Sequence, residues 1–180
     1  MYGDRQEPGL AEQVAKALVN KGFRLGTLGR SEAAIAVYDE VVSRYGDRQE
    51  PGLAEQVAAA LGNKGWLEYS DGCYEESVAA SRAALARLPQ EIWIRCNLAL
   101  ALLHLSEPEE ARELYAGVAR AIETADELDR LAIRDLEDAL AKHPDLTGAA
   151  EVLEKLRVRR SALRRGSQEP GNPGKVALPG

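Results

Sequence analysis

Residues 2–15 read YGDRQEPGLAEQVA, and residues 45–58 read the same fourteen letters again, 43 positions later. Extending both copies by seven residues adds only two differences, which are Lys16 against Ala59 and Val19 against Gly62. Self-similarity at a fixed offset indicates a repeat array, in which each supersecondary unit buries its apolar face against its neighbours. The chain is therefore predicted to be a stacked repeat protein. Extended stacks of this kind mostly provide surfaces for binding, so the repeat favours recognition over catalysis.

The composition favours helices and a cytoplasmic protein that does not contact membranes. The 180 residues are 45% hydrophobic but only 5% aromatic, and alanine, leucine, glutamate and arginine dominate. The most apolar stretch, 98–105, is too short to cross a bilayer, and residues 1–9 lack the layout of a signal peptide. Two cysteines, Cys73 and Cys96, make no disulfide framework and suit reduced thiols in the cytosol.

Turn and capping signals divide the chain into eight helices in four antiparallel pairs. The predicted ranges are about 8–28, 31–45, 53–69, 74–88, 91–105, 107–122, 125–142 and 147–165. Gly29 is expected to end the first helix in the left-handed conformation. The residues expected to cap helix N-termini with their side chains are Ser31, Ser106, Thr124 and Thr147. Residues 166–180 are rich in glycine and proline and are predicted to be disordered.

Three of the helix pairs place small and large residues in matching positions. The first pair has Leu18, Gly22, Leu25, Ala34 and Tyr38; the second has Leu61, Gly65, Gly72 and Pro89; the third has Leu98, Ala99, Leu102, Ala111 and Tyr115. This placement resembles the tetratricopeptide repeat (TPR) of bacterial type, whose pattern of about 34 residues is W-x2-L-G-x2-Y, then A-x3-F, then P. Asn63 and Asn97 are 34 positions apart, whereas Asn20 and Asn63 are 43 apart because of a longer linker.

The resemblance implies an all-α fold, a right-handed α-solenoid of antiparallel helix pairs. The solenoid is expected to cover residues 1–165. Its three TPR-like units are expected at about 10–46, 53–89 and 91–122, followed by a divergent capping pair at 125–165 with a polar outer face. Gly22 is expected to let the two helices of its pair approach closely, opposite Ala34.

The first helix of each TPR unit lines a concave groove in related proteins, and this implies a binding site here. Asparagine recurs at one groove position in all three units, and its amide is both donor and acceptor for the backbone of an extended peptide. The expected peptide-binding residues are Asn20, Phe23, Asn63, Trp66, Asn97 and Leu100. Two alternatives stay open: the asparagines can bond within the array, and Trp93 can pack between repeats. Only Lys16 and Arg95 lie near the positions that grip a carboxylate in some family members, so a carboxylate clamp is not expected.

The chain lacks the motifs of common enzymes, including GxSxG, the P-loop, GxGxxG and HExxH. His104 and His143 are far apart in the pattern and are interpreted as solitary polar residues. We therefore expect a non-enzymatic protein–protein interaction module without cofactor or metal. The main alternative is a structural module, cut from a longer array, that self-associates through its N-terminal repeat. A weaker alternative is a nucleic-acid adaptor using the basic run 155–165, although the net charge of −6 disfavours nucleic acid.

Overall fold

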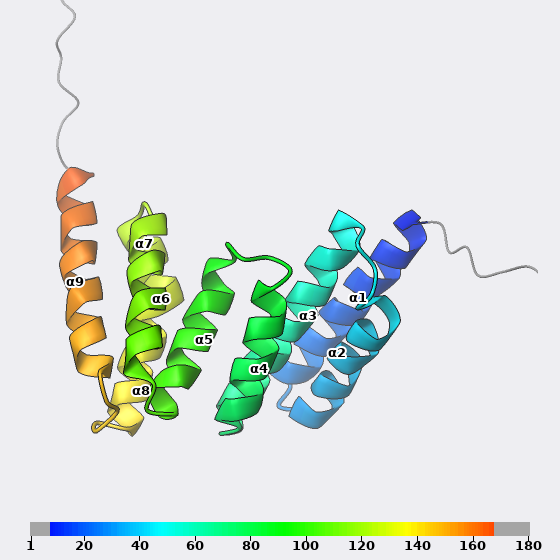
Figure 1. The fold of residues 1–180 in the computed structure, drawn as a ribbon, viewed down its shortest axis with the longest axis horizontal. Helices are drawn as coiled ribbons and strands as arrows, with labels where there is room; N and C mark the ends of the chain where they lie inside the picture. Colours follow the sequence, from blue (N-terminus) through cyan, green and yellow to red (C-terminus); the bar gives the residue numbers. More distant parts are fainter. Residues whose placement is uncertain (1–7, 168–180) are drawn as a thin grey trace, which may run out of the picture.

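The computed structural model describes residues 8–167 and contains helices without strands over that range. The helices are α1 (Pro8–Thr27), α2 (Ser31–Tyr45), α3 (Pro51–Ser70), α4 (Tyr74–Leu85), α5 (Ile92–His104), α6 (Pro108–Ala121), α7 (Ala125–Leu128), α8 (Arg134–Lys142) and α9 (Ala149–Gly166). They follow the sequence along the long axis of the molecule, from α1 at one end to α9 at the other (Figure 1). The predicted all-α class is confirmed.

The stack is built from helix hairpins that pack on the next hairpin. α1 packs on α2, α3 on α4 and α5 on α6, while α1, α3 and α5 also contact one another in sequence. α5 forms the centre of the C-terminal core, and every residue from Cys96 to Leu103 in it is buried. This agrees with its apolar pattern, which extends around the whole helix.

A π-helical turn, η1 (Asp129–Ile133), joins α7 to α8 without a break, so residues 125–142 form one continuous helix. The Thr124 side chain caps its start by accepting a hydrogen bond from the backbone N–H of Glu127 at 3.2 Å, as predicted. A π-turn contains one residue more than an α-turn, so it rotates the side chains that follow by about 100° around the helix axis. α8 therefore presents a different face from the one that the α-helical periodicity of α7 would predict.

Two glycines permit close helix crossings in the first two hairpins. A Cβ atom at Gly22 would lie 2.5 Å from a ring carbon of Tyr38, and a Cβ at Gly65 would lie 2.9 Å from the hydroxyl of Ser81. Both glycines are buried, and so is Ala34 on α2. The close approach expected at Gly22 is confirmed, with the Tyr38 ring as the partner.

Three of the four predicted side-chain caps are wrong. Ser31 is the first residue of α2, while α6 and α9 are preceded by Glu107 and Gly148, and the structure gives none of these helix starts a side-chain cap. Ser106 instead ends α5: it has a φ of 60°, and the N–H of Glu107 donates to the carbonyl of Leu102. Gly29 and Gly72 end α1 and α3 in the same left-handed conformation. The signal read as a helix start at Ser106 thus belongs to the end of the preceding helix.

The predicted disordered tail begins at residue 166, but α9 extends to Gly166, and residues 168–180 lie outside the described part of the chain. The other helix bounds differ from the predicted ones by at most three residues, and several coincide with them.

Candidate functional site

Three of the predicted peptide-binding residues come together in one hollow between α1 and α3, which we call the apolar pocket. Its volume is about 170 Å³, and its lining consists of Phe23, Gly26, Thr27, Tyr38, Asn63, Trp66 and Leu67. Phe23 is 58% exposed and Trp66 is 36% exposed. Two neighbouring repeats therefore place aromatic rings and the Asn63 amide around one site that solvent reaches.

The other predicted residues are placed differently. Asn20 is exposed on α1 but does not line the apolar pocket. Asn97 and Leu100 are only 8% and 2% exposed, because α5 is covered on nearly all sides. The predicted groove is therefore more accessible over the first two repeats than over the third.

Two further residues of α5, Trp93 and Cys96, are explained by packing. Trp93 packs over Gly62, where an added Cβ would overlap the indole ring, so its contact lies between repeats. The structure thus agrees with the alternative in which Trp93 packs between repeats. Neither cysteine is in a disulfide; Cys73 is exposed, and burial raises the pKa of the Cys96 thiol to about 12. Cys96 is thus a packed residue without a reactive thiolate at neutral pH.

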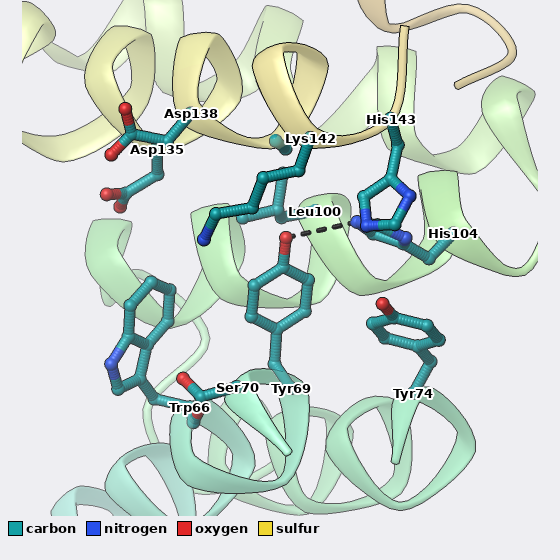
Figure 2. Close-up of a pocket in the computed structure, with 11 residues that line it drawn as sticks. Trp66, Tyr69, Ser70, Tyr74, Leu100, His104, Asp135, Asp138, Lys142 and His143 are labelled. Atoms are coloured by element: carbon teal, nitrogen blue, oxygen red, sulfur yellow. Dashed lines mark hydrogen bonds between the residues drawn. The ribbon is translucent and has the colours of Figure 1, made fainter. Parts of the chain in front are cut away.

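A second hollow of about 250 Å³ lies between α3, α5 and α8, and we call it the aromatic–acidic pocket (Figure 2). Its lining comprises Trp66, Tyr69, Ser70, Tyr74, Leu100, His104, Asp135, Asp138, Ala139, Lys142 and His143. Trp66 belongs to both pockets, so the two sites adjoin on one face of the stack. Sequence reasoning missed the contribution of α8, because the last helix pair matches no repeat register and gives no indication of which face it turns inward.

Aromatic contacts fix the walls of this second pocket. The Trp66 and Tyr69 rings stack with centroids 5.5 Å apart, and the Tyr74 ring lies nearly parallel to that of His104 at 4.2 Å. The His104 and His143 rings meet edge to face at 5.0 Å. The interpretation of the two histidines as solitary residues is therefore wrong, since the antiparallel hairpins bring the ends of α5 and α8 together.

The polar groups of the pocket have shifted proton affinities. Burial, together with the neighbouring His143, lowers the pKa of His104, which is therefore neutral at pH 7. The Tyr69 hydroxyl lies 3.1 Å from His104 Nε2, and a neutral ring with its proton on Nδ1 accepts a hydrogen bond from that hydroxyl. Burial, and then the charge of Asp138, raises the pKa of Asp135. Within residues 8–167, no group of three or more His, Cys, Asp or Glu side chains is arranged to hold a metal ion.

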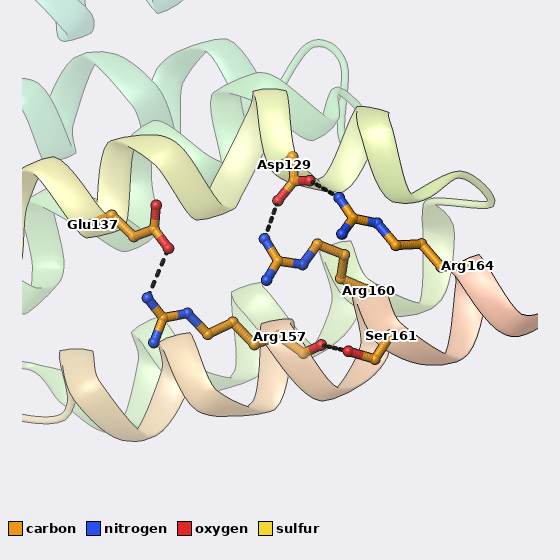
Figure 3. A network of polar contacts seen from close by, with 6 residues as sticks. All are labelled: Asp129, Glu137, Arg157, Arg160, Ser161 and Arg164. Atoms are coloured by element: carbon orange, nitrogen blue, oxygen red, sulfur yellow. Dashed lines mark hydrogen bonds and ion pairs between the residues drawn. The ribbon is translucent and has the colours of Figure 1, made fainter.

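The basic run on α9 holds that helix to the stack (Figure 3). Arg160 and Arg164 pair with Asp129 at 2.7 and 3.0 Å, and Arg157 pairs with Glu137 at 2.8 Å. Nucleic-acid binding would need these three arginines to contact phosphates, but each already pairs with a carboxylate of the helix 125–142. The arrangement is therefore a reason against that alternative.

Comparisons with known proteins support the fold. Thirteen chains of solved structures match this one, among them the "MamA RS-1 ArsTM double mutant", which belongs to a TPR-containing protein. Its similarity has a TM-score of 0.57 at 18% sequence identity and covers 87% of this chain and 78% of that chain. The chain thus has a TPR-type helical repeat fold.

The sequence comparisons give a different and more limited result. A family model described as "LytR cell envelope-related transcriptional attenuator" matches residues 4–64, about a third of the chain, and it is not a TPR model. No curated protein matches. In the part of the chain that the structure describes, every helix is too short or too polar to span a bilayer.

Proposed function

We propose that this chain is a non-enzymatic protein-interaction module that binds an extended peptide segment of a partner along the face formed by α1 and α3. The observation that carries the proposal is the apolar pocket, where Phe23, Asn63 and Trp66 converge from two repeats. An exposed pair of large aromatic residues around a hollow is typical of an interaction site.

The chemistry of the pocket suits a peptide. An apolar side chain would fill the space between Phe23 and Trp66, and the half-buried Asn63 amide would bond a peptide N–H or C=O group. Asn20, exposed one turn before Phe23 on α1, would extend these backbone contacts. Asn97 and Leu100 belong to the same proposed face, but their burial gives them a smaller part in direct contact.

The test selects ligands from a random peptide display library on the immobilised intact chain and measures the selected peptide by calorimetry. Asn63→Ala should weaken binding by about 1–3 kcal/mol, because it leaves peptide groups unpaired. Trp66→Ala should weaken it as much or more, because it removes an aromatic anchor. Since the lining of the apolar pocket is uncharged, the contribution of its contacts to the affinity should change little with salt.

The control variant is Val158→Ala, which truncates a side chain that is 60% exposed on α9, outside both pockets. It should leave the affinity unchanged. If Asn63→Ala and Trp66→Ala bind the selected peptide as tightly as the parent chain, the binding face lies elsewhere and the proposal is wrong.

A second candidate function is self-association through the N-terminal repeat. Large apolar side chains are exposed at this end of the stack, with Leu10 at 53% and Leu28 at 73%. Such residues favour contact with another apolar surface, and a second copy of this chain would supply one.

A further inference from the structure

The acidic residues of the helix 125–142 fall into two groups that face different neighbours. Asp129 and Glu137 face α9, where arginines neutralise both (Figure 3). Asp135 and Asp138 face the aromatic–acidic pocket, on the side where Trp66 and Tyr69 lie (Figure 2). Among residues 8–167, no Lys, Arg or His forms an ion pair within 4.0 Å with either of these two carboxylates. Lys142 lines the same pocket without pairing with them.

Asp135 is partly buried beside Asp138, and the charge of Arg134 offsets only part of the resulting cost, because the pKa of Asp135 stays raised. A cation in the pocket would relieve the remaining cost. The opposite wall consists of the stacked rings of Trp66 and Tyr69. The faces of such rings attract cations through their quadrupole, most strongly for tryptophan. Aromatic rings lie on one side and two carboxylates on the other, and Lys142 is the only Lys or Arg among the described residues of the lining. The pocket is therefore complementary to one further positive charge.

We propose that the aromatic–acidic pocket binds the side chain of a basic residue, arginine or lysine, of the peptide that the proposed groove holds. This inference rests on the proposed function and specifies its ligand. The volume of about 250 Å³ lies below the range typical of drug-sized ligands, so a single side chain is a suitable occupant. Because the two pockets share Trp66, the ligand has its basic residue close to the apolar residue that fills the apolar pocket.

The remaining groups of the pocket set its pH dependence. His104 on α5 faces Tyr69, Tyr74 and His143, while Asp135, Asp138 and Lys142 come from α8. His104 is neutral at pH 7 and does not repel a bound cation. As the pH falls, protonation of His104 adds positive charge, and protonation of Asp135 removes negative charge. Both changes weaken binding, so affinity for a cation falls toward acidic pH.

The experiment uses the intact chain and a small probe, N-acetyl-arginine amide, followed by NMR of the Trp66 indole N–H. Trp93→Phe identifies the signal, since the chain has two tryptophans. A single side chain should bind weakly, with a dissociation constant on the order of millimolar. N-acetyl-citrulline amide has nearly the same shape without the charge, and it should bind at least about fivefold more weakly.

Three variants locate the effect, each checked by circular dichroism for retained helix. Asp135→Asn with Asp138→Asn should weaken arginine binding about fivefold or more and leave citrulline binding unchanged. Lys142→Gln should tighten arginine binding about twofold, because it removes a nearby like charge. Glu154→Gln removes one charge from an exposed position on α9 outside the pocket and should change nothing.

Equal binding of arginine and citrulline probes, unchanged binding in the double Asn variant, or no shift up to the solubility limit would each overturn the inference. Tighter binding of N-acetyl-glutamate amide would overturn it as well. That result would indicate that His104, His143 and Lys142 bind an anion in this pocket. The probe needs no peptide groove, so its result is separable from the proposed function. One outcome is that the probe binds as expected while Asn63→Ala and Trp66→Ala leave the affinity for selected peptides unchanged. In that case the proposed peptide groove is wrong, and cation binding in the aromatic–acidic pocket is supported. Alternatively, those variants weaken peptide binding, but replacing arginine by citrulline or lysine by acetyl-lysine in the peptide leaves its affinity unchanged. In that case the groove is supported, and cation binding in the aromatic–acidic pocket is wrong.

Discussion

α1 and α3 contain nearly the same sequence over residues 8–22 and 51–65, yet neighbouring helices bury their side chains to different extents. Leu10 is 53% exposed, whereas its counterpart Leu53 is 1% exposed. α1 packs on α2 and α3, while α3 packs on α1, α2, α4 and α5. In a repeat stack most of the burial of a helix comes from its neighbours, so identical side chains contribute differently to stability. The comparison also separates local from tertiary effects, because the local sequence is held constant.

The largest expected difference concerns this leucine pair. Leu53→Ala should lower the free energy of unfolding by about 2–5 kcal/mol, because it leaves a cavity in a packed core. Leu10→Ala removes the same atoms from a half-exposed position and should lower it by less than about 1 kcal/mol. Urea unfolding of both variants measures the contrast, and equal losses would show that α1 is covered as well as α3.

The next effect uses the repeated glycine. Gly65→Leu should lower the free energy of unfolding by about 3 kcal/mol, because the new side chain must displace Ser81 and the backbone of α4. Gly9→Leu adds the same side chain on α1 where nothing lies within 4 Å of the new Cβ, and it serves as the control. A Gly65→Leu variant as stable as the parent in thermal unfolding would contradict the close crossing of α3 and α4.

A smaller effect arises where the two copies diverge, since half-buried Leu25 corresponds to buried Glu68. Burial raises the pKa of Glu68 above 4.5, and one of its carboxylate oxygens is buried without a hydrogen-bond partner. A raised folded-state pKa means that the stabilising contribution is present below the unfolded pKa and is lost as the pH rises through the folded value. Glu68→Gln should therefore gain stability relative to the parent between pH 4 and pH 7, by about 1 kcal/mol.

The measurement is urea unfolding of parent and variant at several pH values, since only their difference isolates Glu68 from other carboxylates. A difference that stays constant with pH would mean that Glu68 titrates normally. A variant that is less stable at pH 7 would mean that its contact with Lys64, 3.7 Å away, outweighs its burial.

The smallest expected effect is weak self-association through α1. Exposed Leu10, Phe23 and Leu28 should cause a concentration-dependent rise in mass in analytical ultracentrifugation over a hundredfold range. Leu10→Lys should reduce the rise, whereas Val158→Lys on α9 should not. A strictly monomeric profile of the parent would remove self-association as a candidate function.

Much of the fold could be predicted from local signals. The repeat offset, the recurring Gly22 and Gly65, and the left-handed turn at Gly29 gave the hairpins and their order, since helix periodicity and close crossings depend on neighbouring residues. The caps at Ser31, Ser106 and Thr147 were mispredicted because the same residue type can end one helix or begin the next. In the site, Phe23, Asn63 and Trp66 were expected from their matching positions in the repeats, and they line one pocket.

The sequence by itself determined where the helices lie, how they pair into hairpins and which aromatic residues share a position in α1 and α3. These features depend on interactions within a turn or a hairpin. Only the tertiary structure decided that Asn97 is buried, that His104 meets His143, and that Asp135 faces Trp66 across a pocket. The α8 residues follow a π-turn and come from a helix pair outside the repeat register. Their facing direction depends on how that pair packs against α5, and no local pattern encodes such long-range packing.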